Sequence, residues 1–165
     1  MMKYKIAAIG GDGIGPEMLE AGINCIEAVG RLEDFEVEFD WFPWGSDYYR
    51  ETGLMMPANG LAQLKEFDSI YFGAVGDPDI PDDITLWGLR IAICQGLDLY
   101  ANVRPSVLLP GVNSPLRPDL ANELDWVVVR ENSEGEYAGV GGRTRQGLTD
   151  EVAIDTSVFS RKFGL

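Results

Sequence analysis

Short strand-like runs alternate with helix-like segments in the N-terminal part of the chain, and this alternation permits few folds. Residues 4–9 and 69–74 are apolar runs, and residues 35–41 alternate apolar with acidic side chains. Apolar side chains recur at helical spacing in residues 16–30 and again in residues 84–97. The resulting β-α-β-α-β order predicts an α/β fold whose sites lie in the loops that follow the strands.

Proline, glycine and capping residues mark the predicted ends of the two long helices. Pro16 suits a first helical turn, where its missing N–H costs nothing, and Gly30 is a fitting stop for that helix. The helix over residues 84–97 has Asp83 or Thr85 as its predicted N-cap. We therefore expect both helices to end close to these residues.

Two glycine-rich loops follow predicted strands. In residues 10–15, the glycines at 11, 13 and 15 allow either tight turns or close approach of the backbone to a ligand. The turn is not the dinucleotide fingerprint, whose last glycine would fall one residue later. Residues 73–79 leave the same two roles open, namely contact with a cofactor and simple chain reversal.

The composition excludes several classes of partner. The 165 residues carry a net charge of −14, which argues against nucleic acid and anionic membranes as partners. No apolar run approaches the ~20 residues of a membrane-spanning helix. The absence of histidine removes His-based triads and His metal ligands. Cys25 and Cys94 lie far apart, so we expect reduced thiols in a cytoplasmic protein.

Two arginines end strand-like segments in the second part of the chain. Residues 100–104 and 126–130 are predicted strands that end in Arg104 and Arg130, and Tyr137 follows. Two guanidinium groups near a phenol suit a small substrate with several carboxylates. The structural alternative is an ion pair with one of the 27 acidic residues for each arginine, and a half-buried sheet position for the tyrosine.

Five ordered motifs resemble one enzyme family. GGDGIGPE, FGAVGDP, LWGLR, YANVRP and VRENSEGEY together resemble the β-decarboxylating dehydrogenases, which act on 3-isopropylmalate, isocitrate, tartrate or D-malate. The resemblance extends over essentially the whole chain. It implies an α/β fold of the isopropylmalate-dehydrogenase type, with a mixed sheet and helices on both faces, in a homodimer.

The resemblance assigns substrate and cofactor contacts. Arg104 and Arg130 match arginines that bind the substrate carboxylates, and Tyr137 matches the tyrosine that protonates the enol after CO₂ leaves. Further matches, for which ordinary packing is the alternative, are positions near the nicotinamide of NAD: Ile14, Ala74 and Val75. The family also uses Mg²⁺ or Mn²⁺, but its aspartate ligands and catalytic lysine have no counterpart here, so we expect no metal ligand in this chain.

The chain departs from the family pattern at one helix. Cys94 stands where many members carry an arginine, and Arg90 lies one helical turn before it, on the same face. Arg90 either supplies the displaced guanidinium or is a solvent-exposed or dimer-facing residue. An arginine there disfavours an isopropyl-bearing substrate, because an unpaired buried charge is costly. We therefore expect NAD-dependent oxidative decarboxylation of a tartrate- or D-malate-type dicarboxylic acid, with 3-isopropylmalate or isocitrate dehydrogenase as the alternative.

The resemblance also implies a division of the chain. Residues 1–99 are expected to form the first part of domain one, on the cofactor side. Residues 100–165 are expected to hold the crossing strand, the start of domain two and a dimerisation arm. Within that arm, residues 138–155 suit an exposed hairpin and residues 156–165 the start of a helix. A non-catalytic fragment or a regulatory-type homologue is the alternative of another class, because the family's catalytic half has no counterpart here.

Overall fold

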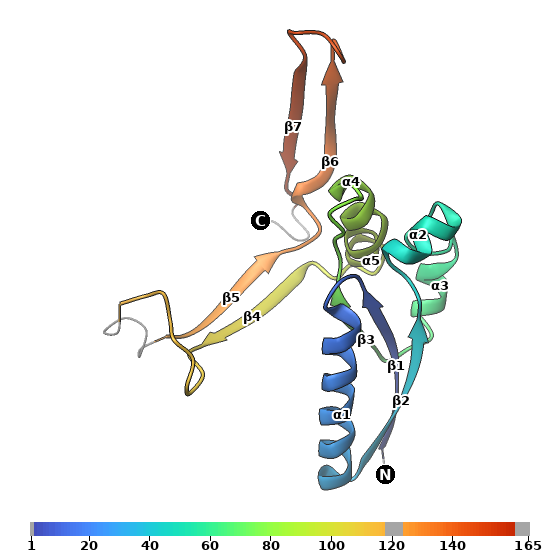
Figure 1. The fold of residues 1–165 in the computed structure, drawn as a ribbon, viewed down its shortest axis with the longest axis vertical. Coiled ribbons are helices and arrows are strands. Elements are labelled where there is room, and N and C mark those ends of the chain that lie inside the picture. Colours follow the sequence, from blue (N-terminus) through green and yellow to red (C-terminus); the bar gives the residue numbers. More distant parts are fainter. Residues whose placement is uncertain (1, 118–123, 161–165) are drawn as a thin grey trace. The chain divides into compact units, whose positions relative to one another are not determined.

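The chain folds into two compact units. The computed structural model describes residues 2–117 and 124–160, and it divides into units Met1–Leu97 and Asp98–Leu165 (Figure 1). The boundary lies near the predicted division after residue 99. The assignment of each unit to a domain of a longer fold stays a prediction.

The first unit contains a parallel three-stranded sheet. Its central strand is β1 (Met2–Gly11), which pairs on one side with β2 (Phe35–Phe42) and on the other with β3 (Ser69–Ala74). The three predicted strands are confirmed. Because all three are parallel, the turns that follow them meet at one edge of the sheet, where sites of α/β folds are found.

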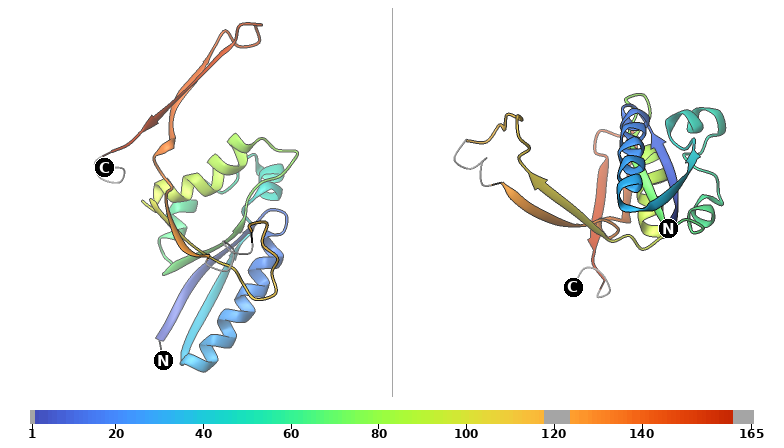
Figure 2. Two further views of the ribbon diagram at one scale, coloured as in Figure 1. Left: turned by 90° about the vertical axis from the view of Figure 1, so that its left-hand side faces the viewer. Right: turned by 90° about the horizontal axis from the view of Figure 1, so that it is seen from below.

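Helices cover both faces of this sheet, as the α/β prediction requires. One face carries α1 (Gly15–Glu33), whose Leu19 and Ile23 pack on Ala8. The opposite face packs Ala7 and Ile9 against residues from the remaining helices. Those helices are α2 (Ser46–Thr52), α3 (Gly60–Leu64), α4 (Asp82–Thr85), the π-helical turn η1 (Leu86–Arg90) and α5 (Ile91–Gly96). Figure 2 shows α1 on one side of the strands and α2 and α3 on the other.

The end of α1 differs from the prediction. The helix continues to Glu33 and ends at Asp34, which takes the left-handed conformation with φ 56° and donates its backbone N–H to the Gly30 carbonyl. Gly30 lies inside the helix, where a Cβ atom would come within 2.8 Å of the Phe35 carbonyl oxygen. Its glycine therefore permits close packing of helix on strand, and the prediction of a stop at Gly30 is wrong.

The second long helix also begins differently. It starts at Asp82 with Pro81 in the N-cap position, and Asp83 and Thr85 lie inside it, so neither is the cap. A π-helical turn then interrupts it, with the Ile91 N–H bonded to the Leu86 carbonyl. Such turns are frequent at functional sites. None of the helices in the described residues is both long and apolar enough to cross a bilayer.

In its described residues, the second unit contains two antiparallel strand pairs. Strand β4 (Ala101–Val107) pairs with β5 (Asp125–Glu131), and β6 (Gly135–Thr144) forms a hairpin with β7 (Val152–Val158). These pairs confirm the two predicted strands and the predicted hairpin. The helix predicted from residue 156 is wrong as far as residue 158, because these residues extend β7, and residues 161–165 lie outside the described part.

Candidate functional site

The glycine turn after β1 packs directly on the end of β3. A Cβ atom at Gly11 would lie 1.9 Å from the Ala74 carbonyl oxygen, and one at Gly15 would lie 2.1 Å from the Gly10 carbonyl oxygen. The backbone N–H of Asp12 donates to the same Ala74 carbonyl at 2.7 Å. Gly11 and Gly15 therefore permit close packing of the turn on other backbone atoms of the chain, a role that neither predicted alternative, tight turn or approach to a ligand, had named.

The predicted cofactor contacts lie on these two adjoining turns. The side chain of Ile14 is 60% exposed, whereas Val75, which follows Ala74, is partly buried against the core. At Gly13 and Gly76 no atom lies within 4 Å of where a Cβ would be, so the backbone there is open to a ligand. This open edge could admit the flat nicotinamide ring, and contact by the three predicted residues stays a prediction.

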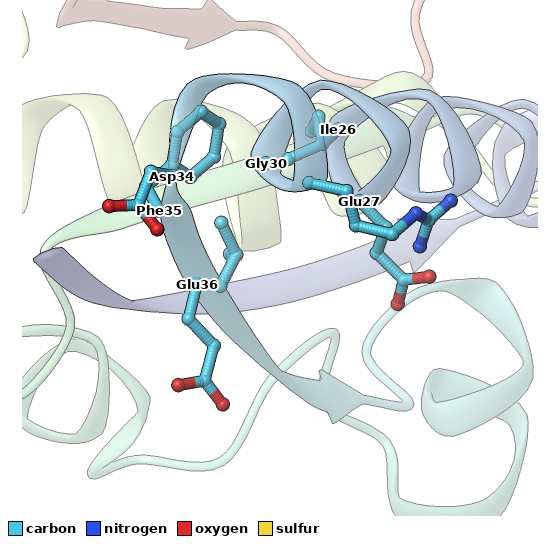
Figure 3. Close-up of a pocket in the computed structure, with 8 residues that line it drawn as sticks. Ile26, Glu27, Gly30, Asp34, Phe35 and Glu36 are labelled. Carbon is cyan, nitrogen blue, oxygen red and sulfur yellow. The ribbon is translucent and has the colours of Figure 1, made fainter. Parts of the chain in front are cut away.

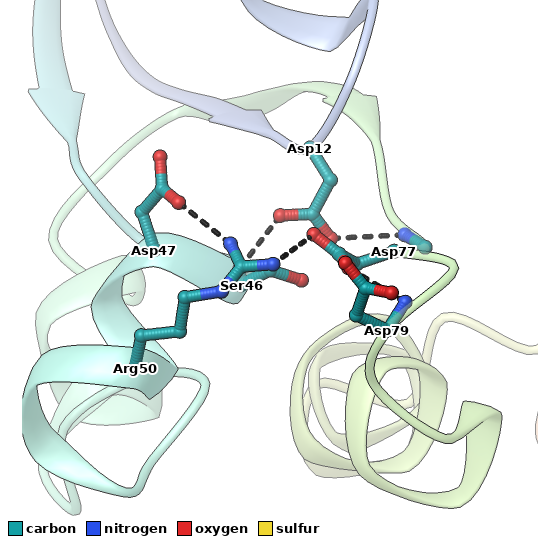
Figure 4. Close-up of polar contacts among 7 residues, drawn as sticks. Asp12, Ser46, Asp47, Arg50, Asp77 and Asp79 are labelled. Carbon is teal, nitrogen blue, oxygen red and sulfur yellow. Dashed lines mark hydrogen bonds and ion pairs between the residues drawn. The ribbon is translucent and has the colours of Figure 1, made fainter.

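A buried carboxylate joins the turns. Asp12 is 8% exposed, and its Oδ1 accepts the backbone N–H of Ser46 at 2.6 Å. Its Oδ2 accepts the backbone N–H of Gly76 at 2.9 Å (Figure 4). Asp12 is not among the site residues predicted from the sequence. The sequence feature that could have indicated Asp12 is its acidic side chain within a glycine-rich turn, because such a turn does not itself require a carboxylate.

An ion-pair network holds the outer part of the loop after β3. Arg50 donates to Asp47 at 2.8 Å and to Asp77 at 2.7 Å, and the Asp79 backbone N–H also donates to Asp77 (Figure 4). The bonds from Asp79 and Arg50 lower the pKa of the Asp77 carboxyl, although burial opposes this. The bond to Asp77 in turn raises the pKa of Arg50. The loop is thereby anchored to α2.

In the second unit, the strand register places Arg104 and Arg130 on one face. Arg104 lies opposite Val128, and Asn102 lies opposite Arg130. Opposite residues, and residues two apart on one strand, point to the same face of a sheet. The two arginines are therefore diagonal neighbours, a relation in which Cβ atoms are roughly 7–8 Å apart. The structure brings together two of the predicted substrate ligands.

Tyr137 lies against Arg130. The guanidinium Nη2 donates to the phenol oxygen, and the guanidinium carbon is 5.2 Å from the centre of the ring. Arg130 also forms an ion pair with Glu136 at 3.1 Å. That partner is 66% exposed, and exposed pairs contribute little to stability, so a substrate carboxylate could replace it. A cavity of about 290 Å³ opens beside both predicted residues.

A tight turn between β5 and β6 positions this pair. Both oxygens of Glu131 accept hydrogen bonds, Oε1 from the Ser133 N–H and hydroxyl at 2.8 Å and Oε2 from the Glu134 N–H at 2.7 Å. Burial acts to raise the pKa of the Glu131 carboxyl, but these bonds outweigh it and the pKa is lowered. Gly135, with φ 65°, completes the turn. Glu131 is not among the predicted site residues, because its role depends on this local geometry.

Arg90 lies in the first unit, at the end of the π-helical turn. It is half-buried, whereas Cys94 is 9% exposed among core residues that include Leu89 and Ile91. The cysteine thus contributes to the core in the place of the family arginine. Substrate binding by Arg90 stays a prediction.

A second cavity, larger than the one beside Arg130 and Tyr137, lies in the first unit at the edge of the sheet where β2 begins. No predicted site residue lines it. Its volume is about 440 Å³, and Figure 3 shows it between the end of α1 and the start of β2. Sites in parallel α/β sheets lie instead at the carboxyl ends of the strands. We therefore assign it no role. Within residues 2–117 and 124–160, no group of three or more Cys, Asp or Glu side chains could hold a metal ion.

Comparison with known proteins places the chain among dehydrogenases. The family model described as isocitrate/isopropylmalate dehydrogenase matches residues 5–163. A probable tartrate dehydrogenase/decarboxylase of Agrobacterium vitis is 59% identical over 162 residues, which are 98% of this chain and 45% of that protein. The decarboxylating D-malate dehydrogenase of Escherichia coli K12 is 47% identical over 98% of this chain and 46% of its own length. The chain thus spans about half the length of these relatives.

Solved structures agree with this placement. The crystal structure of an isocitrate dehydrogenase from Methylococcus capsulatus is 28% identical, with a TM-score of 0.77 over 96% of this chain and 43% of that one. A β-decarboxylating dehydrogenase from Thermococcus kodakarensis is 31% identical, with a TM-score of 0.62 over 96% of this chain and 41% of that one. The fold described above is therefore one found in solved dehydrogenases.

Proposed function

The chain belongs to the isocitrate/isopropylmalate dehydrogenase family, and from this premise we propose that it supplies the acid-binding and nicotinamide-facing part of an NAD-dependent decarboxylating dehydrogenase. Its proposed substrate is a small 2-hydroxy dicarboxylic acid of the tartrate or D-malate type. The names of the relatives with 59% and 47% identity support this choice over 3-isopropylmalate or isocitrate.

The observation that carries the proposal is the common face of Arg104 and Arg130. A guanidinium binds a carboxylate through two parallel hydrogen bonds, so two arginines on one face can orient an acid with two carboxylates. The net charge of the chain is −14, so anionic substrates require such local positive charge. We propose that Arg90, which precedes both arginines in the sequence, is a third substrate-binding residue.

The proposed reaction has two stages, oxidation of the 2-hydroxyl group to a ketone and then loss of CO₂. Bound NAD⁺ would supply the acceptor for the hydride that leaves C2 of the substrate, and a divalent cation would supply a Lewis acid for the substrate oxygens, while the hydroxyl proton would pass to a base other than the residues assigned here. The ketone formed lies β to a carboxylate, whose C–C bond then breaks to release CO₂ and leave an enolate. The Tyr137 hydroxyl donates a proton to the enolate carbon, and Arg130 fixes the phenol for this step.

We also propose that the β6–β7 hairpin mediates a homodimer. The strand register places Val140, Val152, Ile154 and Val158 on one face, with side chains 43–55% exposed. Contiguous exposed apolar side chains of this kind mark interaction surfaces. Light scattering after gel filtration would test this, since a monomer at micromolar concentration would contradict it.

The cellular setting is proposed from charge and cysteine chemistry. Cys25 is exposed and Cys94 is buried, and neither forms a disulfide. Reduced cysteines suit a reducing compartment, which supports a cytoplasmic location. The strong negative charge supports the absence of nucleic-acid and membrane partners.

The test is an assay of the longest natural chain that carries residues 1–165. Formation of reduced nicotinamide is followed with D-malate, tartrate, isocitrate and 3-isopropylmalate, each with NAD⁺ and Mn²⁺. We expect kcat/KM to be highest for D-malate or tartrate. Preference for isocitrate or 3-isopropylmalate would refute the substrate class. Absence of activity with all four acids would favour the non-catalytic alternative.

A further inference from the structure

Asp12 connects the turns that follow all three strands of the parallel sheet. It lies in the turn after β1, and its carboxylate accepts one N–H from Ser46, after β2, and one from Gly76, after β3. Its own N–H donates to Ala74 at the end of β3. The partners of the carboxylate are 34 and 64 residues away in sequence, so a local turn requirement does not explain this residue.

The surroundings are shaped for a carboxylate at this point. Gly45, with φ 152°, precedes Ser46, and a Cβ atom at Gly45 would lie 2.7 Å from Oδ1 of Asp12. Glycine thus leaves the room that the oxygen occupies. Both partners are N–H donors, so each oxygen must be an acceptor, which a carboxylate provides and an amide provides only once.

The connection reaches the residues proposed to face the nicotinamide. Ile14 lies two residues after Asp12, and Val75 lies directly before Gly76. The loop after β3 is anchored at its inner part by Asp12 and farther along by the Asp77–Arg50 pair. Movement of either turn would change the spacing of the open edge between Gly13 and Gly76.

We propose that Asp12 is a positioning residue for the nicotinamide cofactor: its carboxylate fixes the spacing of the turns after β1 and β3, against which the cofactor binds, and ties both to the start of α2. This inference rests on the proposed function, because that function places the cofactor at these turns. Asp12 itself need not touch the cofactor. It acts through the backbone of its neighbours.

The test uses the longest natural chain that carries this segment, with the variants Asp12→Ala and Asp12→Asn. The asparagine variant keeps the volume but loses one of the two acceptors. Glu20→Ala, which removes an exposed carboxylate from α1, is the control for loss of one negative charge. Amide hydrogen exchange at Ser46 and Gly76 reports the two bonds, and quenching or enhancement of NADH fluorescence on titration reports cofactor affinity.

For Asp12→Ala we expect exchange at both amides to accelerate by at least about tenfold, because each loses a bond to a charged acceptor. We expect the Kd for NADH to rise about tenfold, with less than about a twofold change in KM for the acid. Asp12→Asn should release one amide and weaken NADH binding less. Should Asp12→Ala not fold, the asparagine variant decides alone. Glu20→Ala should match the unmodified chain.

Two results would overturn the inference. One is unchanged exchange at both amides in a folded variant. The other is released amides with unchanged affinity for NADH, which would reduce the role of Asp12 to stability. A chain that binds NADH but oxidises none of the four acids would refute the dehydrogenase proposal, and the inference would still be decided by the ratio of NADH affinities. A chain that binds no NADH would overturn both.

Discussion

Replacing Gly15 with alanine would test whether the glycine turn is built for backbone packing. The added Cβ atom would lie 2.1 Å from the Gly10 carbonyl oxygen and 2.7 Å from the Ala74 backbone nitrogen. Both are backbone atoms, so no side chain can rotate away, and β1 or β3 must move. Overpacking of this kind costs up to about 3 kcal/mol, and occasionally more.

Helix propensity acts in the opposite direction at this position. Gly15 is the first residue of α1, and alanine is favoured over glycine in helices by up to about 1 kcal/mol. The net expected loss in the free energy of unfolding is therefore about 2 kcal/mol. With a urea m-value of about 2 kcal/mol/M, the midpoint should fall by about 1 M.

The matched control is Gly13→Asn in the same turn. Gly13 has φ 56° and no atom within 4 Å of its Cβ position, and asparagine tolerates the left-handed conformation. We expect this variant to lose less than about 1 kcal/mol. Urea unfolding followed by the fluorescence of tryptophans, including the buried Trp44, measures both variants. A Gly15→Ala chain as stable as the unmodified one would refute the packing argument, as would an equal loss in Gly13→Asn.

Three further predictions follow from the second unit. Arg130→Gln should raise KM for the acid and lower kcat, with a loss of about 2–5 kcal/mol in transition-state stabilisation. The control Arg31→Gln, on α1, should leave KM and kcat unchanged. Steady-state kinetics of Arg130→Gln that match those of the unmodified enzyme would exclude Arg130 from the site. Because hydrogen bonds hold the pKa of Glu131 below its ordinary value, its contribution to stability should be complete above about pH 4.3 and be lost as the pH falls through the folded-state pKa. Glu131→Gln should therefore weaken the decrease of the urea midpoint at low pH. The same decrease in the variant and the unmodified chain would argue against this role of Glu131. Ile154→Lys should dissociate the proposed dimer, whereas Ala153→Lys, on the other face of the hairpin, should not; light scattering that finds the same mass for both would reject the interface.

Sequence patterns were sufficient where the local signal and the packing agree. The period of two in residues 35–41 corresponds to β2, one strand of a sheet covered on both faces. Pro16 lies in the first turn of α1 as predicted. The predicted helix end at Gly30 was wrong because that glycine permits close contact with the Phe35 backbone. Close packing and helix termination both favour glycine, so the residue type does not distinguish them.

Other elements depend on partners that a local pattern does not contain. The π-helical turn over Leu86–Arg90 interrupts a segment that the sequence pattern predicts to be one continuous helix. Residues 156–158 continue β7 because β6 supplies their hydrogen-bond partners, which overrides the predicted helix. Glu131 acquires its role only when the turn to β6 brings the N–H groups of Ser133 and Glu134 to its oxygens.

The sequence by itself determined the alternation of strands and helices, the family, and the residue types available for binding an acid. These follow from side-chain periodicity and from motifs that are contiguous in the chain. The tertiary structure decided that Arg104 and Arg130 share a face, because the register between β4 and β5 sets this relation. It also decided the role of Asp12, because both N–H groups that its carboxylate accepts come from turns distant in sequence.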